Sequence, residues 1–259
     1  MDITPIVRPL FAKRQKQIDL FERYGDEIQK KQLYNLLETA QNTEIGKLYR
    51  FKKIPDYKTF SEQVPLITYE ELKPYVERML KGENNLIWPS KVRWFAKSSG
   101  TTNDKSKFIP VSKEGLYQCH YRGGTDCVVS YLNMNPDSRM FSGKGLGSHQ
   151  ISSLRKDIRC GDLSACLIQN INPLVNLIRV PEKRIALMSE WEKKLEEIVR
   201  STLHKNVTNL SGVPSWFLTL IKKILQQSGK QYLSEVWPNL EVFFHGGISF
   251  EPTALIIKS

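Results

Sequence analysis

The sequence contains little cysteine, and none of it is arranged to bind zinc or to stabilise a small fold. Four cysteines occur among 259 residues, and no two of them form a CxxC pair. Because metal-binding and redox cysteines usually occur in such pairs, neither zinc nor a disulfide framework is indicated. Cys119 and Cys127 fall in a stretch with apolar periodicity, where we expect them to act as small core residues.

Long hydrophobic runs are also missing. No stretch approaches the roughly 20 apolar residues that a membrane helix needs. The N-terminus begins Met-Asp-Ile-Thr-Pro and lacks the basic start and apolar core of a signal peptide. The basic helix expected near the N-terminus has an apolar face too short to favour a membrane surface over packing. We therefore expect a cytoplasmic protein with no membrane partner.

The patterns of nucleic-acid binding and of hydrolysis are absent as well. The chain carries 38 Lys and Arg against 27 Asp and Glu, a net charge of +11, but the basic residues are scattered among acids on expected helix surfaces. No aromatic-interleaved basic stripe marks a nucleic-acid partner. No Ser-His-Asp arrangement, metal-ligand cluster or distinctively spaced carboxylate pair supports a hydrolase. A hydrophobic content of 40% instead predicts a globular protein with a sizeable core.

The pattern of the first 93 residues predicts a mainly helical region. Apolar periodicity indicates one amphipathic helix over residues 7–24, ending near Gly25, and a second over 26–42. Thr68 and Glu71 form a capping box that opens a third helix, which we expect to reach Lys81 and stop at Gly82.

From residue 94 onward, strands and helices alternate. Residues 94–111 predict a strand, a loop and a strand, and Ser112 caps a helix of about twenty residues. A second capping box at residues 189–192 opens another helix, and Pro214 begins one that ends at Gly229. Residues 206–210 and 240–244 predict strands. The glycine-rich stretch 142–147 lacks the spacing of a nucleotide loop and is interpreted as a strand connection.

This alternation predicts an α/β fold with a largely parallel sheet and covering helices. We expect three regions: a mainly helical lead-in over 1–93, an α/β nucleotide-binding part over 94–252, and an atypical tail over 253–259. In such folds ligands bind outside the carboxyl ends of the strands.

The loop between the strands of residues 94–111 is the main candidate site. Backbone N–H groups around a glycine, hydroxyls and a lysine ammonium together suit the oxygens of a polyphosphate, which favours ATP. The loop differs from a Walker motif because Lys107 leads into Phe-Ile-Pro-Val and not into a helix. On composition alone, a plain turn is the commoner structure. The candidate phosphate-binding residues are Ser98, Ser99, Gly100, Thr101, Thr102 and Lys107.

A second candidate segment is His245-Gly246-Gly247, which follows the strand expected at 240–244. Since both glycine segments follow strands, we expect that they share one rim of the sheet. His245 has two interpretations: it contacts a nucleotide or an acid substrate from that rim, or it caps a turn.

Three segments, taken in order, resemble the auxin-responsive "Gretchen Hagen" family of acyl-acid amido synthetases, in the adenylate-forming superfamily. They are residues 64–72 (Val-Pro-Leu-Ile-Thr-Tyr-Glu-Glu-Leu), residues 98–102 followed by Lys107 and Pro110, and residues 244–252 (Phe-His-Gly-Gly-Ile-Ser-Phe-Glu-Pro). The resemblance covers nearly the whole chain to Pro252, but only about the first half of a family member.

The resemblance implies a ligase that uses ATP and magnesium to activate a small carboxylic acid as an acyl-adenylate. The acyl group then passes to the amine of an amino acid. Residues 98–102 and Lys107 would bind the phosphates, and Gly246 and Gly247 would pass near the nucleotide. Preorganised donors of this kind stabilise the charge that develops at the α-phosphate.

The sequence departs from the family in two places. Asn103 and Asp104 stand where relatives often have glycine, although both tolerate left-handed backbone. After Pro252 the family continues into a magnesium-binding glutamate, a ribose-binding aspartate and a C-terminal lid domain, which are not found here. We therefore expect a truncated or frameshifted product with an exposed strand edge, which makes it poorly soluble or dependent on a partner, and with no turnover by itself. The alternatives are a non-catalytic nucleotide-binding or interaction remnant and an acyl-CoA ligase-like enzyme.

Overall fold

The computed structural model describes residues 2–98, 107–147 and 159–246. The chain divides into two compact units, and each takes separate segments of the sequence. Unit 1 comprises Met1–Lys13, Cys127–Ser152 and Leu167–Ser259. Unit 2 comprises Arg14–Asp126 and Ser153–Cys166. The sequence predicts a boundary at residue 93 because helices are expected before it and strands after it. Among residues 2–93 the regular elements are indeed helices.

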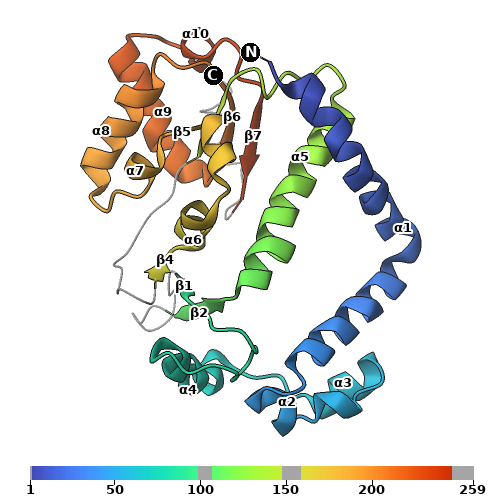
Figure 1. The fold of residues 1–259 in the computed structure, drawn as a ribbon. Coiled ribbons are helices and arrows are strands. Elements are labelled where there is room, and N and C mark those ends of the chain that lie inside the picture. The colour runs from blue at the N-terminus through green and yellow to red at the C-terminus, as the bar shows by residue number, and fades with distance from the viewer. Residues whose placement is uncertain (1, 99–106, 148–158, 247–259) are drawn as a thin grey trace. The chain divides into compact units, whose positions relative to one another are not determined.

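The N-terminal helix α1 (Thr4–Ala40) contains a break in its backbone at Tyr24, where φ is −127° and ψ is 30°. The sequence predicts two helices separated near Gly25, so the break lies one residue before the expected position. Three short helices follow in unit 2 (Figure 1): α2 (Glu44–Leu48), η1 (Phe51–Lys53) and α3 (Tyr57–Gln63).

The helix α4 (Tyr69–Leu80) has the capping box that the sequence predicts. The carboxylate of Glu71 accepts a hydrogen bond from the backbone N–H of Thr68 at 2.6 Å and one from its hydroxyl at 2.8 Å. The helix ends before Gly82, whose φ of +96° is a left-handed conformation that glycine adopts without strain. Both predicted ends are therefore confirmed.

Unit 2 contains a three-stranded sheet in the order β2-β1-β4. Strands β1 (Trp94–Lys97) and β2 (Phe108–Val111) pair antiparallel, and β1 pairs parallel with β4 (Arg159–Gly161). The helix α4 packs on this sheet through one apolar cluster, because a helix with an apolar stripe must bury it against another element. The buried members of the cluster are Val76, Met79, Leu86, Val92 and Phe95.

The helix predicted after Ser112 has two parts, η2 (Gly115–Tyr121), a π-helical segment, and α5 (Arg122–Met134). The Ser112 hydroxyl accepts a hydrogen bond from the Gly115 N–H at 2.9 Å, as expected of a cap. One expectation for this segment is wrong: Cys119 and Cys127 are exposed and do not contribute to a core.

Unit 1 contains a four-stranded sheet in the order β5-β3-β6-β7, with every pairing parallel. The strands are β3 (Lys144–Gly147), β5 (Arg179–Val180), β6 (Val207–Gly212) and β7 (Val242–His245). The stretch interpreted as a strand connection is therefore β3 itself. A Cβ on Gly145 would come within 2.6 Å of the side-chain oxygen of Asn209 in the neighbouring strand, so a larger residue there would require that side chain to move.

Two long helices, α8 (Trp191–Thr202) and α9 (Pro214–Ser228), cover one side of this sheet (Figure 1). Pro214 stands in the first turn of α9, and Gly229 ends it with φ of +65°, as the sequence predicts. The expected capping box at residues 189–192 is wrong, because Glu190 is the N-cap of α8 and makes no side-chain capping bond. The core between sheet and helices includes Leu146, Val207, Leu210, Ile198, Val199, Phe217, Leu220, Ile221 and Ile224.

The remaining elements are short. They are α6 (Leu163–Asn170), η3 (Pro173–Leu177), α7 (Lys183–Ala186) and α10 (Leu233–Val236). The α/β class with mainly parallel pairing is confirmed, although the described strands form two sheets. Among the helices that the structure describes, none combines the length and apolar character needed to cross a bilayer.

Candidate functional site

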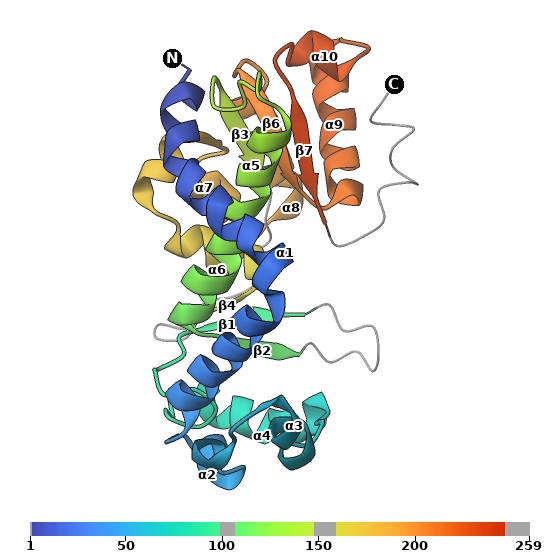
Figure 2. The ribbon, with the colours of Figure 1, turned by 90° about the vertical axis from the view of Figure 1, so that its right-hand side faces the viewer.

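The candidate phosphate loop connects strands β1 and β2. The two strands pair antiparallel and lie side by side in Figure 2. The register pairs Lys97 with Phe108, and one step further the Ser98 N–H donates to the Lys107 carbonyl at 3.0 Å. Ser98 and Lys107 therefore face each other where the ladder ends. This confirms the two predicted strands on either side of the loop. The other four predicted phosphate ligands, Ser99, Gly100, Thr101 and Thr102, lie outside the described residues.

The side chain of Lys107 lies over an aromatic ring. Its ammonium nitrogen is 5.3 Å from the centroid of the Tyr69 ring, which is within the range of a cation–π interaction. The ion pairs found among the described residues do not include Lys107.

Tyr69 also holds the first residue of β2. Its hydroxyl accepts a hydrogen bond from the Phe108 N–H at 2.8 Å and lies 3.3 Å from the Phe108 carbonyl oxygen. Tyr69 is the first residue of α4, directly after the N-cap residue Thr68. The segment 64–72 and the loop segment, which the sequence presents as two separate motifs, are thus in contact through one side chain. Sequence reasoning did not single out Tyr69, although its place inside the first motif was an available signal.

His245 ends β7, and Gly246 follows it in an exposed position. The imidazole lies against Phe243, with ring centroids 5.7 Å apart. In the register of β6 and β7, His245 stands opposite Gly212 at the carboxyl ends of the two strands. The helix α9 begins two residues after Gly212, so the positive end of its dipole lies at the same end of the sheet.

The shared rim of the two glycine segments stays a prediction. β1 and β7 belong to different sheets, in unit 2 and unit 1 respectively. Gly247 lies outside the described residues. A Cβ on Gly246 would meet no heavy atom within 4 Å, which leaves open space around that position.

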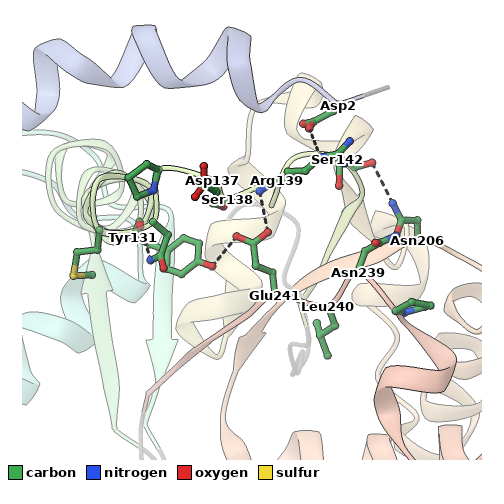
Figure 3. A pocket seen from close by; sticks show the side chains of 14 residues that line it. Asp2, Tyr131, Asp137, Ser138, Arg139, Ser142, Asn206, Asn239, Leu240 and Glu241 are labelled. Atoms are coloured by element: carbon green, nitrogen blue, oxygen red, sulfur yellow. Dashed lines mark hydrogen bonds and ion pairs between the residues drawn. The ribbon is translucent and has the colours of Figure 1, made fainter.

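A polar cavity of about 850 Å³ lies in unit 1 (Figure 3). Its lining includes Ser142, Asn206 and Glu241, which lie one or two residues before strands β3, β6 and β7. It therefore lies at the amino ends of the parallel strands, opposite to the end at which α/β sheets bind nucleotides. We do not assign the nucleotide to it.

Glu241 organises this cavity. As Figure 3 shows, its carboxylate accepts hydrogen bonds from the Tyr131 hydroxyl at 2.7 Å and from the Arg139 N–H at 2.9 Å. Burial, and then the hydrogen bond to this carboxylate, raise the pKa of Tyr131 to about 12. Arg139 also pairs with Asp2 at 3.0 Å. The polar groups here are engaged with one another, as in a structural network.

No group of three or more His, Cys, Asp or Glu side chains is arranged to hold a metal ion in the ranges that the structure describes. The magnesium expected from the resemblance therefore stays a prediction.

Proteins of one family are among those similar to this chain. The model of the GH3 family N-terminal domain matches residues 14–257. The chain is 36% identical over 106 residues to indole-3-acetic acid-amido synthetase GH3.2 of Arabidopsis thaliana, a match that covers 40% of this chain and 19% of that protein. It is 33% identical over 105 residues to jasmonoyl–L-amino acid synthetase JAR6 of Nicotiana attenuata, which covers 39% of this chain and 18% of that protein.

The solved structure of a GH3.15 acyl acid amido synthetase has a similar fold, with a TM-score of 0.64 at 22% identity. That match covers 82% of this chain and 38% of the other. The stretches matched in the two curated relatives span about a fifth of those proteins. Since the family match takes in almost the whole chain, the described hairpin included, the chain belongs to the GH3 family and carries its N-terminal domain.

Proposed function

We propose that this chain supplies the nucleotide-binding part of an ATP-dependent acyl-acid amido synthetase. The carboxylate of a small acid would attack the α-phosphate of ATP, with magnesium, to form an acyl-adenylate and release pyrophosphate. The amine of an amino acid would then attack the acyl carbon and displace AMP to form an amide. The names of the relatives specify indole-3-acetic acid and jasmonoyl–amino acid synthesis, and a solved GH3.15 structure holds 2,4-DB. For this chain we propose only the class of substrates, a small carboxylic acid and an amino acid.

The observation that carries this proposal is the end of the β1–β2 hairpin. Ser98 and Lys107 face each other at the point where the strands part, and the Lys107 ammonium rests on the Tyr69 ring. A cation next to backbone N–H groups and hydroxyls is the donor set that a polyphosphate requires. The described part of the hairpin therefore fits a phosphate ligand.

The roles proposed for the individual residues follow from this placement. Ser98, Ser99, Gly100, Thr101, Thr102 and Lys107 bind phosphate oxygens. The ammonium of Lys107 neutralises charge, and the hydroxyls and N–H groups donate hydrogen bonds. His245, Gly246 and Gly247 lie beside the nucleotide, where the absence of a side chain at Gly246 leaves room for it.

The test is ATP binding by the chain in the presence of magnesium, measured by isothermal titration calorimetry. Removing one charge-assisted hydrogen bond costs about 1.5–3 kcal/mol, so we expect Lys107→Ala to weaken binding by about tenfold or more. Lys91→Ala is the matched control, because Lys91 is exposed, lies in the same unit and precedes β1 at its opposite end. The affinity of Lys91→Ala for ATP should stay within about twofold of the affinity of the unsubstituted chain.

Two results would count against the proposal: no ATP binding by the unsubstituted chain, or equal losses in Lys107→Ala and Lys91→Ala. Exchange of labelled pyrophosphate into ATP, dependent on an added carboxylic acid, separates the ligase from a nucleotide-binding remnant. A remnant would bind ATP and show no exchange with any acid.

A further inference from the structure

We propose that Tyr69 is a positioning residue, which holds Lys107 in place to receive the phosphates. This inference rests on the proposed function. It is carried by three contacts that one side chain makes: its ring under the Lys107 ammonium at 5.3 Å, and its hydroxyl against the N–H and the carbonyl of Phe108 at 2.8 and 3.3 Å.

The position of Tyr69 is itself fixed from two sides. At its N-terminal side, the capping box of Thr68 and Glu71 sets where α4 begins. Towards the core, Val76 and Met79 of α4 belong to the same apolar cluster as Phe95 of β1, and Phe108 packs against that cluster. A ring carried on the first turn of α4 is therefore held at a constant place relative to β2.

The contact matters because a lysine side chain is flexible. Ordering its four-carbon stem costs rotamer entropy, which is normally lost when an anion binds. An aromatic face that already holds the ammonium removes part of this cost before binding. The hydroxyl of Tyr69 adds a link between this ring and the backbone of Phe108 in β2. The Lys107 ammonium is thus held close to the point where the pairing of β1 and β2 ends.

The helix α4 offers a matched control within itself. Arg78 lies over the ring of Tyr75, 5.9 Å from its centroid, so a second tyrosine of the same helix carries a cation that has no part in the hairpin. Both tyrosines contact the described core of unit 2 or its edge, and both substitutions remove one aromatic ring from the same helix. Loss of ATP affinity should follow Tyr69→Leu and not Tyr75→Leu.

The first measurement is the NMR signal of the Lys107 ε-methylene group in chain labelled with ¹³C-lysine, assigned with a Lys107→Arg variant. A ring current should move this signal upfield of the other lysines. The shift should persist in Tyr69→Phe and Tyr75→Leu and vanish in Tyr69→Leu. This signal requires no nucleotide, so it reports the contact separately from the proposed function.

The second measurement is ATP affinity in a double-substitution cycle. Because a cation–π contact contributes about 0.5–2 kcal/mol, Tyr69→Leu should weaken binding by roughly three- to thirtyfold. Tyr69→Phe, which retains the ring, should recover most of the affinity. In a Lys107→Ala background, Tyr69→Leu should cause no further loss, since a positioning residue acts only through the residue it positions.

The outcomes are distinguishable. A further loss in the Lys107→Ala background, or an unchanged affinity in Tyr69→Leu, would overturn the role of Tyr69 while leaving ATP binding intact. An absence of ATP binding in the unsubstituted chain would overturn the proposed function and the role of Tyr69 in it, whatever the lysine signal shows. Circular dichroism of Tyr69→Leu establishes that α4 is retained.

Discussion

Arg14 and Asp126 are joined by two parallel hydrogen bonds of 2.7 Å, from Nε to Oδ1 and from Nη2 to Oδ2. Within unit 2 this pair connects α1 to α5 across 112 residues of sequence. Both side chains are mostly buried, with exposed fractions of 17% and 25%. A bidentate pair in such a position is stronger than an ordinary surface ion pair.

The first prediction concerns this pair. The hydrogen bond from Arg14 holds the pKa of Asp126 below its usual value of 3.8, against the opposing effect of burial. A carboxyl with a depressed pKa stabilises the fold above its unfolded pKa and loses that contribution as pH falls through its folded pKa. Asp126→Asn should cost about 1–2 kcal/mol of unfolding free energy near neutral pH, and the difference should shrink below about pH 4.

Urea denaturation of both chains at several pH values measures this difference. Glu62→Gln is the control, because Glu62 and its partner Lys58 are exposed and 4.0 Å apart, where an ion pair contributes little. A cost that is the same at neutral and acid pH would show that the carboxylate charge is not the cause.

The second prediction compares two helical glycines of unit 2. A Cβ on Gly46, which is buried in helix α2, would overlap the carbonyl oxygen of Ala40 and lie 2.9 Å from two backbone carbons. Gly123 in α5 has nothing within 4 Å of the same position. Gly46→Ala should therefore destabilise the fold by roughly 1–3 kcal/mol, since backbone must move. Gly123→Ala should be neutral or stabilising by up to about 1 kcal/mol. Equal denaturation midpoints for the two variants would contradict this.

The third prediction concerns Tyr131 in unit 1, whose pKa is raised to about 12, first by burial and then by Glu241. Ultraviolet titration should show a phenol that ionises near pH 12 and disappears in Tyr131→Phe. Glu241→Gln removes the negative charge, so the pKa of Tyr131 should fall but stay above 10, because burial remains. Because the pKa of Tyr131 is higher in the folded state than in the unfolded state, the neutral phenol stabilises the fold. This contribution is present below about pH 10 and is lost as the pH rises through about 12. Titration at the ordinary tyrosine value would refute the network.

The fourth prediction concerns thiol reactivity. Cys119 and Cys127 are exposed, whereas Cys166 is buried and burial raises the pKa of its thiol to about 11. Because the thiolate is the reactive form, an alkylating reagent should modify Cys119 and Cys127 quickly and Cys166 only after unfolding. Mass spectrometry of timed samples measures the three rates. Alkylation of Cys166 as fast as of Cys119 in the native chain would contradict the described burial.

Local signals in the sequence were sufficient for most elements. The limits of α4 follow from a capping box and a left-handed glycine, and those of α9 from Pro214 and Gly229, because capping chemistry acts within one turn. The capping box expected before α8 failed although its residues fit the pattern. There Glu190, and not Ser189, occupies the N-cap.

The prediction was wrong for the glycine-rich stretch that forms β3. The stretch 142–147 has low strand propensity and was predicted as a connection, yet β3 pairs with β5 on one side and β6 on the other. A side chain at position 143 or 145 would come too close to Asn206 or Asn209 of the adjoining segment. That approach is a property of the packed sheet and cannot be deduced from glycine itself.

The sequence by itself determined the α/β class, the two strands on either side of residues 98–107 and the family resemblance, because each is carried by the order and spacing of short segments along the chain. Only the tertiary structure decided which strands share a sheet, and that Tyr69 meets Lys107 from 38 positions away. Contacts of that kind form when α4 buries its apolar face against β1 and β2, so they depend on packing between elements that local sequence does not encode.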